Sequence, residues 1–193
     1  MKFYNTIFAT PIIELDIKIN NKKIINYIKK IQKYSSGRVV SNEGGWQSED
    51  LNPNLDILKP LTKHIIEGSI EFAKNCKFKP GKYSVHNLWA NINNYKDSNA
   101  PHVHQYCMLS GVYYLKAPKN SGNLVLKHPS ACLEYDWNKT KMIEHMEYNS
   151  ALYNFVPKEG QLLLFPSWVE HFVKPNLNKT QERISIAFNI GVI

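Results

Sequence analysis

The stretch RISIAFNIGV, residues 183–192, decides the fold because its side chains alternate with a period of two. Successive side chains of an extended strand point to opposite faces. One face carries the apolar residues Ile184, Ile186 and Phe188, and the other carries Arg183, Ser185 and Ala187. We therefore expect a strand whose apolar face packs against helices and whose Arg183 face looks into the interior of a β-structure.

The chain after Pro80 contains further segments of this texture, separated by clusters of turn-forming residues. The predicted strands are SVHNLWANINNY (84–95), YCMLSGVYYLKA (106–117), GNLVLKH (122–128), ALYNFVP (151–157), QLLLFP (161–166) and HFVKP (171–175). The predicted turns are KDSNAP (96–101), PKNSG (118–122), PKEG (157–160) and PNLNKTQE (175–182). Residues 134–148 are predicted to form a loop that forms or closes a pocket.

The first third of the chain has helical periodicity instead. From Asn21, isoleucines recur at helical spacing with lysines on the other side, and a second helix is predicted from about Leu55 to about Asn75, with Pro60 in its first turns. Its apolar side would carry Leu58, Leu61, Ile65 and Phe72. Residues 35–54 read as a loop, and the opening 17 residues as a first strand rather than a signal peptide.

Helices followed by many short strands predict an antiparallel sandwich or barrel with helices on one face. At 193 residues, one domain is expected, with helical support at about 21–75 and the barrel at about 80–193. No apolar stretch approaches the ~20 residues of a membrane span, so we expect a soluble cytoplasmic protein. Three widely spaced cysteines without a C-x-x-C motif indicate neither a disulfide framework nor a structural zinc site.

The formal net charge of +8 comes almost entirely from lysines that are spread along the chain. They form no dense basic block, so a nucleic-acid partner is not expected. Only two of the 24 basic residues are arginines, Arg38 and Arg183. An arginine on the interior face of a predicted strand is therefore informative: its planar fork can bind a carboxylate through two hydrogen bonds, and Ser185 adds a hydroxyl donor. The alternative for Arg183 is a surface ion pair, with Glu182 for instance.

Two histidines, His102 and His104, stand two residues apart just before a predicted strand. In an extended backbone both imidazoles project to one side, which is the geometry of two ligands on one metal. His171 opens a later strand after a Pro166-Ser-Trp turn, a rigid position for a third ligand. Imidazole suits Fe, Zn, Cu and Ni alike, so the histidines do not select the metal.

These motifs together resemble the Fe(II)- and 2-oxoglutarate-dependent oxygenases, in particular a subfamily of small bacterial and phage members. The resemblance is carried by LSGVYYL (109–115), FPSWVEHFVKP (165–175) and RISIAFN (183–189), with GGWQS (44–48) and WANINNY (89–95) upstream. It covers residues 44 to 191 and implies a double-stranded β-helix, the jelly-roll barrel that cupins share. It also implies oxidative decarboxylation of 2-oxoglutarate to succinate and CO2, coupled to hydroxylation of a substrate, with ascorbate as an expected stimulant.

Carried onto this chain, the resemblance implies that His102 and His171 bind Fe(II). Arg183 and Ser185 would hold the distal carboxylate of 2-oxoglutarate. Weaker candidates for the cosubstrate pocket are Asn91, Asn93 and Tyr114, for which structural roles are the alternative.

His104 departs from the family pattern, which has a carboxylate at this position. If His104 binds the metal, the site has three histidines and one negative charge fewer. If it does not, a water or a displaced carboxylate fills the position, and His104 contacts substrate instead. We favour ligation because the two-residue spacing is retained.

Two other interpretations compete with the oxygenase. A cupin-type metalloenzyme would use the same histidines, but Trp168 stands where its motif has glycine, no glutamate follows His104 at the expected distance, and Arg183 is left without a task. A non-enzymatic binding module has only the positive charge in its favour. The substrate class, a protein prolyl side chain or a small metabolite, is not encoded, and the oligomeric state is open, a homodimer included. Trp46 and Trp168 could line a substrate groove or pack at the barrel edge.

Overall fold

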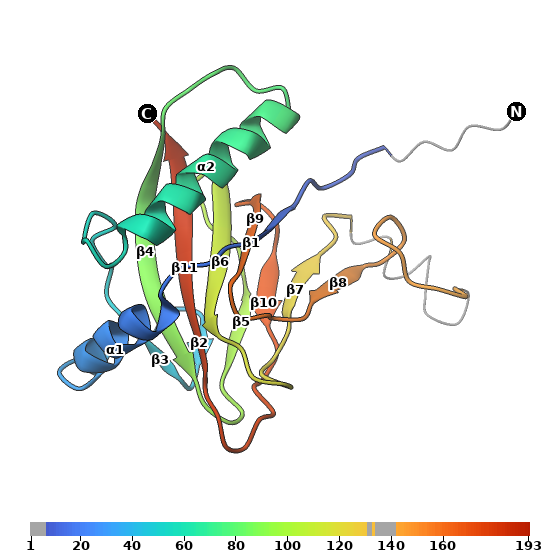
Figure 1. Ribbon diagram of the computed structural model, residues 1–193. Helices are drawn as coiled ribbons and strands as arrows, with labels where there is room; N and C mark the ends of the chain where they lie inside the picture. Colours follow the sequence, from blue (N-terminus) through green and yellow to red (C-terminus); the bar gives the residue numbers. More distant parts are fainter. Residues whose placement is uncertain (1–6, 131–132, 134–141) are drawn as a thin grey trace, which may run out of the picture.

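The computed structural model describes residues 7–130, 133 and 142–193, and they form two antiparallel sheets with two helices (Figure 1). The larger sheet has six strands in the order β1-β9-β6-β11-β4-β3. Its strands are β1 (Ile13–Asp16), β9 (Gln161–Pro166), β6 (Leu109–Lys116), β11 (Arg183–Val192), β4 (Tyr83–Asn93) and β3 (Trp46–Gln47). The smaller sheet has the order β2-β5-β10-β7-β8. Its strands are β2 (Asn42–Glu43), β5 (Ser98–His102), β10 (His171–Val173), β7 (Leu124–Lys127) and β8 (Leu152–Phe155).

Strand β11, which contains the RISIAFNIGV stretch, lies inside the larger sheet. It pairs with β4 from Arg183↔Asn93 to Val192↔Tyr83 and with β6 from Ile184↔Lys116 to Ile190↔Leu109. Its alternation separates two faces as predicted: Ile184, Ile186 and Phe188 belong to the core beneath the helices. Arg183 and Ser185 lie on the opposite face, toward the smaller sheet.

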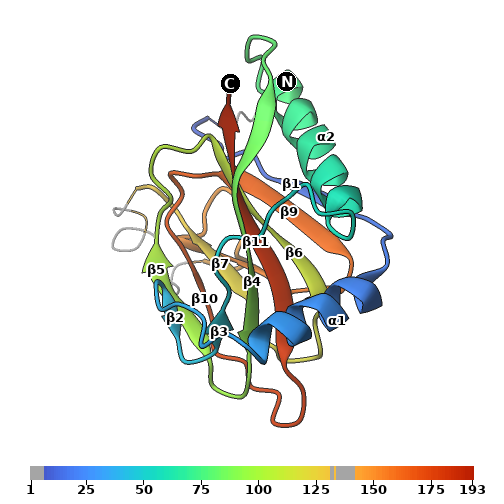
Figure 2. The ribbon, with the colours of Figure 1, turned by 90° about the vertical axis from the view of Figure 1, so that its left-hand side faces the viewer.

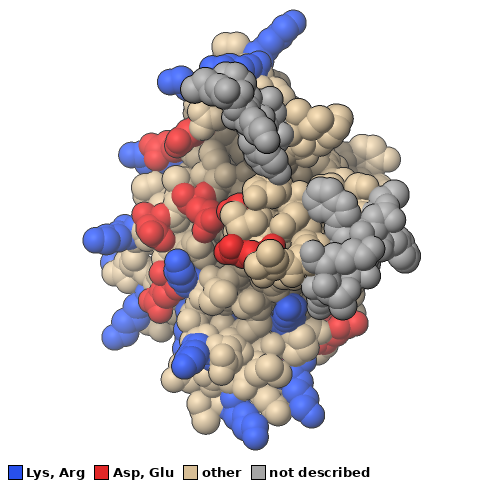
Figure 3. All heavy atoms as spheres, turned by 90° about the vertical axis from the view of Figure 1, so that its right-hand side faces the viewer, with Lys and Arg blue, Asp and Glu red and all other residues tan. Residues whose placement is uncertain are grey.

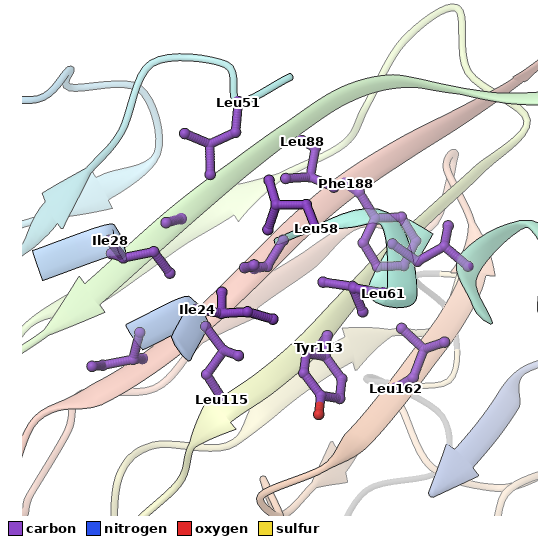
Figure 4. Packing of buried hydrophobic residues seen from close by; sticks show 14 of the residues in the cluster. Ile24, Ile28, Leu51, Leu58, Leu61, Leu88, Tyr113, Leu115, Leu162 and Phe188 are labelled. Carbon is purple, nitrogen blue, oxygen red and sulfur yellow. The ribbon is translucent and has the colours of Figure 1, made fainter. Parts of the chain in front are cut away.

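Both helices cover the outer face of the larger sheet (Figure 2). Helix α1 (Asn21–Gln32) buries Ile24 and Ile28, and the Asn20 side chain caps it by accepting a hydrogen bond from the Lys23 amide. Helix α2 (Lys59–Asn75) has Pro60 in its first turn, where a missing N–H costs little. Figure 4 shows how side chains from both helices and from the sheet interdigitate. Fully burying each large aliphatic side chain contributes roughly 1.5–3 kcal/mol.

A second, smaller core lies between the two sheets. It consists of the buried residues Tyr114, Leu124, Leu126, Phe155, Leu163, Phe165 and Val169. Beside it an open cavity of about 460 Å³ reaches the surface, and Glu147 and Tyr148 are among the residues that line it. Part of the predicted pocket-forming loop, residues 134–141, lies outside the described residues.

The prediction of a sandwich with helices on one face is confirmed, but several segments differ. Helix α2 begins at Lys59 rather than near Leu55, because residues 53–58 form turns before it. Strand β5 occupies residues 98–102 and so includes residues 98–101 of the predicted turn 96–101, and β2 and β3 lie within the predicted loop 35–54. These segments are short or polar and are extended because neighbouring strands pair with them, for example Asn42↔Asn99.

Within the described residues, no helix is both long enough and apolar enough to span a bilayer. The charge distribution agrees with the scattered lysines of the sequence. On the face seen in Figure 3, basic side chains lie scattered toward the edges with acidic side chains among them. The described residues of this face therefore form no continuous basic patch.

Candidate active site

Three imidazoles meet between the two sheets. His102 ends β5, His104 follows in the next loop, and His171 opens β10 directly opposite His102 in the strand register. One ring nitrogen from each lies within 4.8 Å of the other two. The loop is fixed at this point because the His104 amide donates a 3.1 Å hydrogen bond to the Ser167 carbonyl. The predicted convergence of these side chains is thus present in the structure.

Backbone carbonyls hold two of the rings in a defined tautomer. Nδ1 of His102 lies 2.7 Å from the Ala100 carbonyl oxygen, and Nδ1 of His171 lies 2.8 Å from that of Val169. A carbonyl can only accept, so in the neutral ring Nδ1 carries the proton and Nε2 keeps its lone pair. Hydrogen bonds of this kind orient metal-binding histidines.

Burial keeps all three rings neutral at physiological pH. It lowers the pKa of His171 to about 3 and that of His104 to about 4, and in each case the proximity of His102 adds to the effect. Burial also lowers the pKa of His102, against the hydrogen bond to Ala100. Neutral imidazole is the form that binds metals, so the cluster is chemically ready to do so. The three rings meet the donor requirements of an iron centre.

The three histidines line a second cavity of about 60 Å³, separate from the 460 Å³ cavity described above. Arg183 is the one cationic side chain among the residues that line this second cavity, and it is only 2% exposed. Its Nη1 donates to the Gly122 carbonyl at 3.0 Å and to the Ser121 carbonyl at 3.4 Å, and Nη2 donates to Asn93 Oδ1 at 2.8 Å. Nε has no partner among the described residues, and no carboxylate there pairs with the guanidinium. Burial lowers the pKa of Arg183 but an arginine stays charged, so the cavity holds an uncompensated cation.

Gly122 can place its carbonyl on Arg183 because of its backbone conformation. Its φ of +89° lies in the region that favours glycine, and a Cβ there would meet the Lys174 carbonyl oxygen at 2.1 Å. The loop between β6 and β7 can therefore pack closely enough for its Ser121 and Gly122 carbonyls to accept hydrogen bonds from Arg183.

The other predicted cosubstrate residues surround Arg183. Ser185 pairs in register with Asn91 on one side and with Tyr114 on the other, and all three line the cavity. Asn91 Oδ1 is buried without a partner among the described residues. Burial raises the pKa of Tyr114 to about 12, although Arg183 opposes the shift, so its hydroxyl remains protonated. Asn93 does not line the cavity, because its side-chain oxygen is turned to Arg183.

Sequence reasoning missed several residues at the site. Two of them contact His104: Nδ2 of Asn189 is 3.4 Å from His104 Nδ1, and the Trp89 and His104 rings are 5.7 Å apart. The third, Ser110, donates a hydrogen bond to Asn189. Asn189 continues the alternation of Arg183 and Ser185 along β11. The sequence therefore predicts that its side chain lies on the same face as theirs. Ser110 and Trp89 carry no comparable signal.

The two tryptophans considered for a groove differ in position. Trp46 is buried against the main core, and its Nε1 donates to the Ser35 carbonyl at 3.0 Å. Trp168 is 55% exposed in the turn between β9 and β10.

Comparison with known proteins identifies the family. The family described as "Putative 2OG-Fe(II) oxygenase" matches residues 87–189, more than half of the chain. The chain belongs to this family. It is accordingly a 2-oxoglutarate- and Fe(II)-dependent oxygenase, and this decides against the cupin and binding-module interpretations. No curated protein matches the sequence.

Solved structures of low sequence identity share the fold of this oxygenase. A prolyl-4-hydroxylase from Pseudomonas putida is 11% identical with a TM-score of 0.64, covering 93% of this chain and 92% of its own. The viral collagen prolyl hydroxylase of Paramecium Bursaria Chlorella virus-1 is 15% identical with a TM-score of 0.58, covering 93% and 94%. The α-ketoglutarate-dependent epimerase SnoN of nogalamycin biosynthesis is 10% identical with a TM-score of 0.69, covering 95% and 77%. These likenesses bear out the double-stranded β-helix.

Proposed function

We propose that this oxygenase hydroxylates a C–H bond of a protein side chain, such as a prolyl residue, or of a small molecule, and releases succinate and CO2. The observation that carries the proposal is one cavity lined both by three neutral imidazoles and by a buried guanidinium without a carboxylate partner among the described residues. Such a cavity suits a metal together with an anionic chelator.

In this proposal His102, His104 and His171 hold Fe(II). Two of the rings are oriented by backbone carbonyls so that their Nε2 lone pairs are free, and burial keeps all three unprotonated. Bound Fe(II) would supply the redox chemistry with O2 that couples 2-oxoglutarate decarboxylation to substrate hydroxylation.

Arg183 binds the distal carboxylate of 2-oxoglutarate, and Ser185 adds a hydroxyl donor. Asn93 and the carbonyls of Ser121 and Gly122 fix the guanidinium before the cosubstrate arrives. This preorganisation lowers the ordering cost of binding. Asn91 and Tyr114 are the remaining polar groups that could contact the cosubstrate.

The substrate would approach past Trp168. This exposed ring follows Ser167, whose carbonyl accepts the hydrogen bond from the His104 amide. Two substrate classes are to be tested, since the structural neighbours include prolyl hydroxylases as well as an enzyme of nogalamycin biosynthesis. Under the proposal, Trp168→Ala raises the KM of the true substrate and leaves uncoupled succinate formation unchanged.

The test is succinate formation from 2-oxoglutarate with Fe(II), with and without ascorbate, and with proline-containing peptides or small molecules added separately. We expect succinate from the wild type and from His86→Ala, which removes an exposed histidine of β4 outside the cavity. Loss of succinate in Arg183→Gln and His171→Ala is expected. Equal rates in all four proteins would overturn the residue assignments, and a wild type that binds metal but forms no succinate would overturn the reaction.

A further inference from the structure

His104 is held differently from the other two histidines. The Nδ1 atoms of His102 and His171 each face a backbone carbonyl, whereas Nδ1 of His104 faces the side chain of Asn189 at 3.4 Å. His104 also lies in a loop rather than in a strand. Its ring therefore depends on a side-chain partner for orientation and for the position of its proton.

Asn189 is itself fixed by Ser110. The two residues pair in register on the neighbouring strands β11 and β6 (Figure 1), and the Ser110 hydroxyl donates to Asn189 Oδ1 at 2.8 Å. Both are buried, with exposures of 1% for Ser110 and 5% for Asn189. The register of β11 with β4 shifts just after Asn189. Such irregularities re-aim side chains near active sites.

The orientation of the carboxamide decides which His104 nitrogen has a free lone pair. With Nδ2 toward the ring, the amide donates to Nδ1, and the proton of the neutral ring sits on Nε2. With Oδ1 toward the ring, Nδ1–H donates to the amide, and Nε2 is free to bind a metal. Ser110 permits either orientation because a hydroxyl both donates and accepts.

We propose that Asn189, anchored by Ser110, is the positioning residue that makes His104 the third metal ligand. The inference rests on the proposed function, since it concerns the same metal site. The structure places Asn189 Nδ2 toward the ring and Oδ1 toward Ser110. The proposal therefore requires the carboxamide to turn over, so that Oδ1 accepts from Nδ1–H of His104 and Nδ2 donates to the Ser110 hydroxyl. In that orientation Asn189 does for His104 what the Ala100 and Val169 carbonyls do for the other two rings. This chain thus carries a dedicated partner for the one histidine of the cluster that no backbone carbonyl orients.

Metal affinity of the folded protein tests the proposal without any turnover. Co(II) titrations, followed by the ligand-field spectrum and by calorimetry, give the Kd of each variant. Replacing a residue that orients a metal-bound histidine typically costs 10- to 100-fold in affinity. We expect Asn189→Leu to weaken Co(II) binding by about that factor and to shift the spectrum, and Asn189→Asp, which can only accept from Nδ1–H, to retain or improve it.

A double-mutant cycle separates positioning from general damage to the fold. In the His104→Ala background, Asn189→Leu should leave the Kd unchanged, because the ring that it orients is gone. Ser110→Ala keeps a smaller side chain on β6 and should give a weaker effect of the same sign. Additive effects in the cycle, or equal Kd values for Asn189→Leu and the wild type, would overturn the proposal.

Two further variants distinguish failure of the proposal about Asn189 and His104 from failure of the proposed metal site as a whole. If His102→Ala and His171→Ala bind Co(II) as the wild type does, the metal site itself is wrong. If they lose the metal while His104→Ala and Asn189→Leu keep it, the metal site stands and only the role of His104 and Asn189 fails.

Discussion

Replacing the buried arginine by glutamine should cost this oxygenase most of its affinity for 2-oxoglutarate. Arg183→Gln keeps hydrogen-bonding groups for Asn93 and for the carbonyls of Ser121 and Gly122 but removes the charge. Losing one partner of a buried charge pair costs about 2–5 kcal/mol. The Kd of 2-oxoglutarate for the Co(II)-loaded protein should therefore rise by a factor of about 30 to about 5,000.

In the absence of 2-oxoglutarate, the same substitution should not lower the stability of the protein. Arg183 is buried without a carboxylate partner among the described residues, and an uncompensated buried charge is destabilising. We expect the free energy of unfolding of Arg183→Gln to equal or exceed that of the wild type. 2-Oxoglutarate at 100 times its wild-type Kd should stabilise the wild type by about 2.7 kcal/mol, and the variant by less than about 0.9 kcal/mol because its Kd is at least about 30-fold higher.

Calorimetric titration of 2-oxoglutarate into the Co(II)-loaded protein and thermal unfolding measure the two effects. Arg183→Lys is the matched control, since it retains the charge but loses the planar fork, and its affinity should be intermediate. A Kd for Arg183→Gln within threefold of the wild type would refute the reasoning, as would a marked loss of stability in the absence of cosubstrate.

Three further outcomes follow from described residues. Under the proposed function, His104→Asp places a negatively charged ligand at the third metal position, so Co(II) should bind at least about tenfold more tightly; weaker binding would argue against ligation at this position. Folding lowers the pKa of His171 from 6.5 to about 3, so the unfolded chain binds more protons between these values. The metal-free protein should therefore lose up to ~1.4 kcal/mol per pH unit from this group as the pH falls below about 6.5, and pH-independent urea unfolding between pH 7 and 5 would contradict this. Gly111→Ala should destabilise by at least about 1–3 kcal/mol, as measured by urea unfolding, because its Cβ would lie 2.4 Å from the Leu163 carbonyl oxygen and from the Phe188 ring; unchanged stability would disprove this.

The sequence predicted the parts of the fold that depend on strong alternation. Strand β11 matches its predicted residues 183–192 and the predicted faces. Burying the apolar side chain at every second position stabilises this arrangement of the strand. Strand β5 was not predictable in this way. Its residues SNAPH have no apolar alternation, and the segment is extended because β2 and β10 pair with it.

The candidate site also has some features that local sequence patterns predict and others that depend on contacts between distant segments. The convergence of His102, His104 and His171 could be anticipated from spacing and strand context, and so could the inward direction of Arg183. The hydrogen bonds that set the orientation of each ring could not. They depend on carbonyls of Ala100 and Val169 and on a register between β6 and β11 that no local pattern encodes.

The two groups of site residues also differ in how firmly the surrounding structure holds their backbone. Arg183, Ser185 and Asn189 lie on β11, which is flanked by β4 and β6 and backed by the helical core. Amide hydrogens on such a strand exchange with solvent only in large-scale opening. His102 ends the short strand β5 and His104 lies in a loop, so their segment can open locally at much lower free energy. Under the proposed function, we therefore expect metal to exchange through the β5 side of the native protein, while the Arg183 side of the site keeps its shape.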